Sequence, residues 1–129
     1  MFRMRLAYFG GTFDPIHRGH LRLASAAADA FALDRVLFAP VGRQPLKAEG
    51  GEATFADRMA MVTLALADAA DPRFAVSAID APRPDGTPNY TADTLAELRR
   101  TTPDADLFVL TGADSFLTMR QSRSPDQLL

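Results

Sequence analysis

A glycine-rich turn between an apolar run and an amphipathic run constrains the fold of this sequence most strongly. Residues 6–9, Leu-Ala-Tyr-Phe, are typical of a short buried strand. Gly10 and Gly11 follow at once, and their lack of a Cβ atom lets the backbone bend sharply and approach a ligand closely. Residues 18–31 then carry apolar side chains at helical spacing. A strand, a glycine-rich turn and a helix in this order can bind a phosphate in an α/β fold.

Two histidines stand at the expected start of that helix. The preceding Asp14-Pro15 pair indicates a turn, because proline fixes φ and aspartate can accept a hydrogen bond from its own backbone. His17 and His20 are three residues apart, so in a helix both rings point the same way. With the exposed amides and the positive end of the helix dipole they would form a compact anion site. The alternative is a strand–helix turn with two surface or capping histidines, which the complete strand–turn–helix order disfavours.

Length and composition limit the class of protein. With 129 residues, of which 47% are hydrophobic, the chain predicts a single domain, residues 1–129, with a substantial core. It has no cysteine, which excludes disulfides and thiolate metal sites. A formal net charge of −2 and the lack of a long apolar run lead us to expect neither nucleic acid nor a membrane as a partner. The N-terminus lacks signal-peptide organisation, which favours a cytoplasmic protein.

The remaining pattern predicts further strands alternating with helices. Apolar runs favour strands over residues 4–9, 36–40, 74–79 and 107–110. A strand–helix–strand unit of this length gives parallel pairing, and ligands usually bind at the carboxyl ends of parallel strands. We therefore predict an α/β fold with a parallel central sheet.

The same pattern predicts where the helices begin. Thr54 is a good N-cap for one helix, with Asp57 as its third helical residue. Thr91 can cap the next helix, with Tyr90 packed against Leu95. A last helix is expected to begin at Phe116.

The ordered set Gly-x-Phe-Asp-Pro-x-His-x-Gly-His, residues 11–20, resembles the signature of the HxGH nucleotidyltransferase superfamily. Within it, Gly-Gly-Thr-Phe-Asp-Pro-Ile-His, residues 10–17, is most similar to bacterial nicotinate-nucleotide adenylyltransferases, and the resemblance extends with gaps from about residue 5 to the end. It implies a Rossmann-like, three-layer α/β/α fold and adenylyl transfer from ATP to nicotinate mononucleotide in NAD biosynthesis. The products would be deamido-NAD and pyrophosphate. Mg²⁺ would arrive with ATP, with no metal site built by the protein, and a homo-oligomer is compatible with the sequence.

The resemblance also implies roles for individual residues. His17 and His20 would bind the α and β phosphates, and Lys47 would neutralise oxygens of the mononucleotide or the leaving group. Arg58 would either brace the active-site loops or be a solvated helix residue. The implied nucleotide-binding residues are Gly10, Gly11, Thr12, Phe13, Gly19, Tyr90, Thr91, Gly112 and Asp114. Among these, Tyr90 and Thr91 would border a pocket for the pyridine carboxylate, although helix capping alone explains both.

Departures from the family pattern keep alternatives open. The family commonly has histidine where this chain has Leu46, and a tryptophan near Ser122, whereas this sequence has no tryptophan. The C-terminal third of the family, with a Ser/Thr-rich motif that grips the ATP phosphates, has no counterpart here, which leads us to expect a fragment or a truncated relative. A catalytically silent nucleotide-binding module is therefore one alternative. The second alternative is another HxGH transferase, such as a phosphopantetheine adenylyltransferase or a cytidylyltransferase. The sequence of residues 10–17 argues against this second alternative.

Overall fold

The computed structural model describes residues 3–42, 53–112 and 117–122, and for the last of these segments only the backbone. Two of the predicted site residues, Lys47 and Asp114, lie outside the described residues. Their roles therefore stay predictions.

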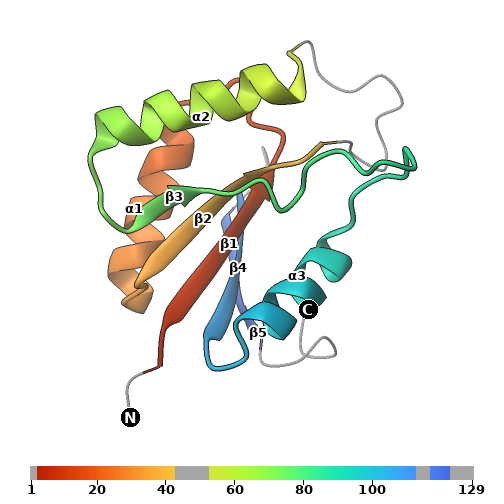
Figure 1. Ribbon diagram of the computed structural model, residues 1–129. Helices are drawn as coiled ribbons and strands as arrows, with labels where there is room; N and C mark the ends of the chain where they lie inside the picture. Colours follow the sequence, from red (N-terminus) through yellow and green to blue (C-terminus); the bar gives the residue numbers. More distant parts are fainter. Residues whose placement is uncertain (1–2, 43–52, 113–116, 123–129) are drawn as a thin grey trace.

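The described strands form one sheet around β1, in the order β3-β2-β1-β4-β5 (Figure 1). The central strand pairs in parallel with β2 and β4, and β3 pairs in parallel with β2. The strands are β1 (Arg5–Gly11), β2 (Arg35–Pro40), β3 (Phe74–Val76), β4 (Asp106–Gly112) and β5 (Leu117–Ser122). The four parallel strands confirm the predicted parallel sheet, and they bring their carboxyl ends to one edge.

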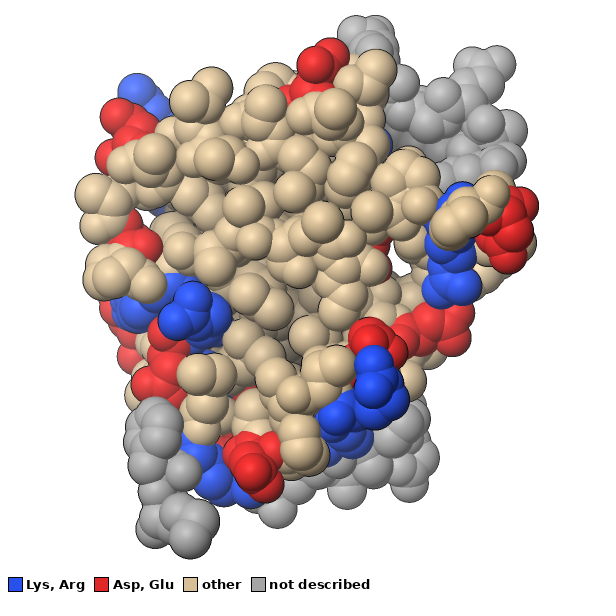
Figure 2. All heavy atoms as spheres, in the orientation of Figure 1, with Lys and Arg blue, Asp and Glu red and all other residues tan. Residues whose placement is uncertain are grey.

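Helices cover both faces of this sheet. The helices α1 (Arg18–Phe31) and α2 (Phe55–Ala69) lie on one face, and α3 (Thr91–Thr101) lies on the other (Figure 1). This arrangement confirms the three-layer α/β/α architecture. Within the described segments, no helix has both the length and the apolar character needed to cross a membrane. Figure 2 shows charges of both signs along the rim of one face, with an uncharged centre.

The alternation of side chains along β1 divides the core into two apolar clusters. Ala7 and Phe9 point towards α1 and α2, where they join Phe38 and Phe108. Leu6 and Tyr8 point to the opposite face, in the cluster that packs under α3. Because β1 is buried on both faces, its sequence reads as a continuous apolar run, as expected for a central parallel strand.

The prediction of a helix beginning at Phe116 is wrong for residues 117–122, the part of it that the structure describes. Residues 117–122 form β5, which pairs antiparallel with β4 in a register that places Met119 opposite Leu110. A segment this short does not fix a helical or a strand period by itself. Pairing with the open edge of β4 satisfies the backbone groups of β5 that face it, and that partner is not visible in the local sequence.

Candidate active site

The turn after β1 is held in one conformation by Phe13. Its φ of 51° lies in the left-handed region, which a phenylalanine rarely adopts and which costs about 1–3 kcal/mol. The side chain is only 3% exposed and packs edge-on against Phe9 at 5.2 Å and against His20 at 4.9 Å between ring centroids. This aromatic packing offsets the backbone strain and joins the turn directly to the histidine pair.

His17 and His20 cap the start of α1 with their own rings. The Gly19 amide donates to Nδ1 of His17, and the His17 amide donates to Nδ1 of His20, both at 3.0 Å. These bonds satisfy two amides that a helix start otherwise leaves unpaired. The rings lie 3.9 Å apart between centroids and are inclined by 31°. Because both Nδ1 atoms accept, each neutral ring carries its proton on Nε2, so the pair offers two N–H donors at the helix start.

Gly19 is required by the position of the His17 ring. A Cβ atom at Gly19 would lie 2.9 Å from Cε1 and 3.0 Å from Nδ1 of His17. Such distances are shorter than normal carbon contacts, so any larger residue would push the ring away from the helix start. The glycine of the motif therefore serves the placement of the imidazole.

Arg58 braces the loops around the turn. Its Nη1 donates to the carbonyl of Thr12 at 3.0 Å and to that of Val41 at 2.7 Å, and its Nε donates to Ala53 at 3.3 Å. The residue is 5% exposed, so of the two interpretations the brace is confirmed. Burial lowers the pKa of the Arg58 guanidinium, and the nearby Asp14 carboxylate opposes that shift. The buried cation thus ties the motif to the end of β2 and the start of α2.

A small cavity lies at the carboxyl ends of β1 and β4, on the face covered by α3. It has a volume of about 170 Å³, and Gly10, Gly11 and Thr91 are among the residues that line it. Ligand pockets commonly measure about 300 Å³ or more, so this cavity suits a single ring and not a whole nucleotide. The structure thus brings the two predicted glycines and Thr91 together at one place.

Tyr8 and Asp80 line this cavity and form a buried polar group with Thr94. Sequence reasoning missed this group. The Tyr8 hydroxyl donates to Oδ2 of Asp80, and the Thr94 hydroxyl donates to Oδ1 at 2.5 Å. All three side chains are buried, with exposed fractions of 4%, 2% and 6%. Burial, and then the charge of Asp80, raise the pKa of Tyr8 well above its usual range, so the phenol stays a donor. A tyrosine within an otherwise apolar strand was the only signal of this group in the sequence.

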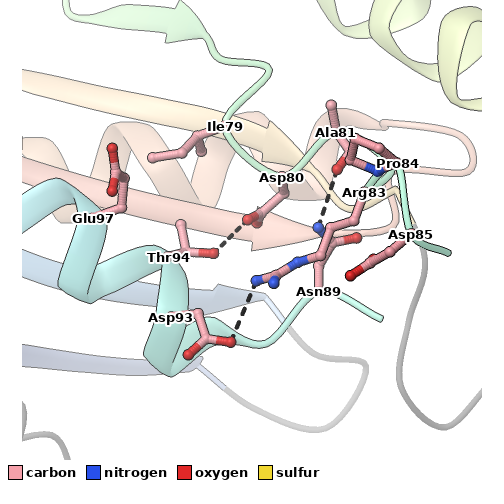
Figure 3. Close-up of a pocket in the computed structure, with 10 residues that line it drawn as sticks. All are labelled: Ile79, Asp80, Ala81, Arg83, Pro84, Asp85, Asn89, Asp93, Thr94 and Glu97. Carbon is pink, nitrogen blue, oxygen red and sulfur yellow. Dashed lines mark hydrogen bonds and ion pairs between the residues drawn. The ribbon is translucent and has the colours of Figure 1, made fainter. Parts of the chain in front are cut away.

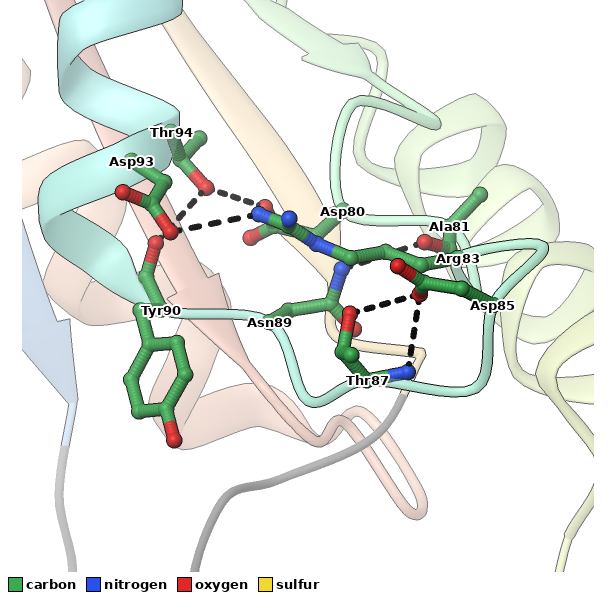
Figure 4. Close-up of polar contacts among 9 residues, drawn as sticks. All are labelled: Asp80, Ala81, Arg83, Asp85, Thr87, Asn89, Tyr90, Asp93 and Thr94. Carbon is green, nitrogen blue, oxygen red and sulfur yellow. Dashed lines mark hydrogen bonds and ion pairs between the residues drawn. The ribbon is translucent and has the colours of Figure 1, made fainter.

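A larger and more open hollow lies on the other side of Asp80, between α3 and the loop that follows β3 (Figure 3). Its volume is about 690 Å³, and acidic side chains, including Asp85, Asp93 and Glu97, line it. Arg83 reaches across it to Asp93 at 3.3 Å (Figure 4). No residue of the glycine–histidine motif lines this hollow, so its size does not make it the candidate active site.

Tyr90 and Thr91, the two residues predicted to border a pyridine pocket, lie in different surroundings at the start of α3. Tyr90 is the N-cap of α3 and is 51% exposed, and its ring points away from Asp80 and Thr94 (Figure 4). Thr91 is the first helical residue, so the prediction that Thr91 caps this helix is wrong by one position. No side-chain cap bond from Tyr90 is present, because its ring carries no acceptor within reach of the first turn. Of the two, Thr91 lines the cavity and Tyr90 does not.

Thr12 and Gly112 are the remaining predicted site residues that the structure describes. Thr12 lies in the turn and accepts from Arg58, and Gly112 ends β4 at the same edge of the sheet as the turn. Within the described segments, no group of three or more histidine or acidic side chains could hold a metal ion.

Comparison with known proteins shows which family this sequence matches. Residues 8–129 match the model of the cytidylyltransferase-like family. The chain is 50% identical over 113 residues to a probable nicotinate-nucleotide adenylyltransferase of Citrifermentans bemidjiense, covering 88% of this chain and 50% of that protein. It is 48% identical over 126 residues to the protein of the same name in Corynebacterium kroppenstedtii, covering 97% and 57%. The chain therefore spans about half the length of the curated relatives it matches.

Solved structures share the fold. A Plasmodium falciparum nicotinic acid mononucleotide adenylyltransferase complexed with NaAD superposes with a TM-score of 0.68 at 14% identity, over 83% of this chain and 51% of that one. The same enzyme complexed with APC gives a TM-score of 0.66. At this identity the likeness concerns the fold alone. The match to the family model covers nearly all of the sequence, and the chain therefore belongs to the cytidylyltransferase-like family.

Proposed function

We propose that the chain carries out adenylyl transfer from ATP to nicotinate mononucleotide, giving deamido-NAD and pyrophosphate. The observation that carries this proposal is the reciprocal capping of α1 by His17 and His20, which holds both imidazoles at the helix start through their Nδ1 atoms. Relatives at about half identity that are named nicotinate-nucleotide adenylyltransferases support the choice of substrates.

The reaction needs charge stabilisation and placement, and no protein nucleophile. The 5′-phosphate oxygen of the mononucleotide forms a bond to the α-phosphorus of ATP, and the bond from that phosphorus to the bridging oxygen breaks as pyrophosphate leaves. Negative charge builds on the phosphate oxygens, where the Nε2–H groups of His17 and His20 donate hydrogen bonds. The positive dipole end of α1 acts on the same charge.

The glycines and the cavity account for substrate placement in this proposal. Gly10 and Gly11 line the cavity and also precede the histidine turn, so a ligand can extend from one to the other along the backbone. The pyridine ring would occupy the cavity, with Thr91 at its border and the 5′-phosphate directed towards the histidines. Arg58 holds the turn in place through its bonds to the carbonyls of Thr12 and Val41.

Several elements of the proposal rest on the resemblance alone. Lys47 is proposed to neutralise phosphate oxygens, and Gly112 and Asp114 to border the nucleotide. Mg²⁺ is proposed to reach the site as part of the ATP substrate, bridging phosphate oxygens. A cytoplasmic location and a homo-oligomeric state also stay predictions.

The direct test is a substrate panel read out as pyrophosphate release from ATP·Mg²⁺. Release is expected with nicotinate mononucleotide and not with phosphopantetheine. A comparison of the release rates with nicotinate mononucleotide and with nicotinamide mononucleotide shows which of the two is preferred. Release with phosphopantetheine alone would contradict the proposal and favour the other HxGH transferase. Calorimetric binding of nicotinate mononucleotide without release would favour a nucleotide-binding module.

A further inference from the structure

We propose that Tyr8 and Asp80 are positioning residues for the pyridine end of the mononucleotide: the buried Tyr8–Asp80–Thr94 chain fixes the wall of the 170 Å³ cavity. This inference rests on the proposed function and deepens it. None of the three residues belongs to the glycine–histidine motif.

Asp80 is the point at which four segments of the chain meet. Its carboxylate accepts from Tyr8 on β1 and from Thr94 on α3, while its backbone carbonyl accepts from the Gly42 amide, after β2, at 2.7 Å. Asp80 itself lies in the loop after β3. Figure 3 shows its carboxylate directed at Thr94 on α3. A shift of this one side chain would therefore move β1 and α3 relative to each other.

The burial of Asp80 favours a positioning role. A carboxylate that is 2% exposed loses almost all of its hydration, and no ion pair to it is found within the described segments. Each carboxylate oxygen accepts from one hydroxyl donor, yet an apolar residue at this position would avoid the cost of burying a charge. What the carboxylate adds is a directional connection between the strand and the helix.

Two of the three bonded residues form part of the cavity wall. Tyr8 and Asp80 line the cavity themselves, together with Gly10, and the Tyr8 ring lies over Gly10, where a Cβ atom would come within 2.6 Å of Cζ. Thr94 follows Thr91 by three residues on α3, so both side chains lie on the same side of the helix. The bond from Thr94 to Asp80 therefore sets the orientation of Thr91 at the cavity.

The test compares the binding of two ligands to four chains by calorimetry. Nicotinate mononucleotide and ATP are titrated separately into the wild type, Tyr8→Phe, Thr94→Val and the matched control Thr94→Ser, which keeps the hydroxyl. Loss of one hydrogen bond to Asp80 is expected to raise the Kd for nicotinate mononucleotide roughly tenfold in the first two variants. The Kd for ATP is expected to stay within about twofold, and Thr94→Ser to bind as the wild type does.

The outcomes separate this inference from the proposed function. A wild type that binds no nicotinate mononucleotide contradicts both. A wild type that binds it, with Tyr8→Phe and Thr94→Val binding equally well, overturns the inference alone. If Tyr8→Phe and Thr94→Val weaken the binding of both ligands equally and also lower the Tm, the inference is overturned, because a purely structural role gives that result. Where turnover is measured, the inference predicts a raised KM for the mononucleotide with an unchanged kcat.

Discussion

The imidazoles of His17 and His20 each accept a backbone hydrogen bond through Nδ1, so the bonds that begin helix α1 also fix the ring tautomers. The two interpretations of this pair from sequence, capping residues and phosphate ligands, are therefore compatible, because each role uses a different nitrogen. Nδ1 begins the helix and Nε2 carries the donor hydrogen.

Because Nδ1 alone caps the helix, a different side chain with an acceptor should preserve the cap when the imidazole is removed. His17→Asn supplies a side-chain oxygen at the N-cap, where asparagine is among the best residues, and should leave the free energy of unfolding nearly unchanged. His17→Ala removes the acceptor and should lower it by about 1 kcal/mol. Urea unfolding of the two variants checks this, and equal stability of both would show that the Nδ1 bond does not cap the helix.

Gly19→Ala should displace the His17 ring without weakening the fold. The added Cβ atom would lie 2.9 Å from the ring, whereas alanine in a helix is favoured over glycine by up to about 1 kcal/mol. Because the displaced ring also loses its cap bond to the Gly19 amide, the two effects offset each other, and we expect a nearly unchanged Tm with a lower rate of pyrophosphate release. A variant that keeps the wild-type rate would contradict the assigned position of the ring.

Arg58→Ala should destabilise the chain by about 2 kcal/mol, because three carbonyls lose a charged donor in a partly buried place. Arg58→Lys should restore little of this, since one ammonium group does not reproduce the geometry of the guanidinium fork. Urea unfolding measures both variants. The matched control is Arg100→Ala on the exposed surface of α3, for which no measurable change is expected. Equal effects of Arg58→Ala and Arg100→Ala would show that Arg58 is not a brace.

The Tyr8 phenol should resist ionisation for as long as the chain stays folded. Burial and the Asp80 carboxylate raise its pKa, whereas the phenol of the unfolded chain ionises near pH 10. The folded state therefore binds the proton more tightly, and this contribution to stability is present below about pH 10 and is lost as the pH rises further. In Tyr90→Phe, Tyr8 is the only tyrosine. Its phenolate absorbance should appear only together with unfolding, and a reversible rise in the folded chain would contradict the buried pair.

The sequence predicted those elements whose signals are local. The bounds of α1 agree with the prediction at both ends, and Thr54 caps α2 by accepting from the Asp57 amide at 3.1 Å. Strand ends were less accurate: β3 stops at Val76, three residues before the predicted end, because Ser77 onwards belongs to the loop that leads to Asp80. Apolar periodicity shows where an element lies, but tertiary pairing decides where it ends.

The unpredicted parts of the site depend on partners far apart in the sequence. Tyr8 and Asp80 are brought together only when β1 lies beside the loop after β3, and no local pattern marks either as one of a pair. Arg58 was recognisable as a candidate, but its role became clear only from the carbonyls of Thr12 and Val41 on two other loops. The motif residues could be named from sequence because their contacts lie within one turn and one helix start.

The most direct test of the histidine account is pyrophosphate release from ATP·Mg²⁺ and nicotinate mononucleotide by the wild type, His17→Asn and His20→Gln. Both substitutions retain a capping acceptor, glutamine being the usual partner at the third helical position, so both chains should fold as the wild type does. The account predicts a rate lower by about 10²–10³-fold in each, because a donor to the developing charge is lost. Folded variants that release pyrophosphate at the wild-type rate would contradict it.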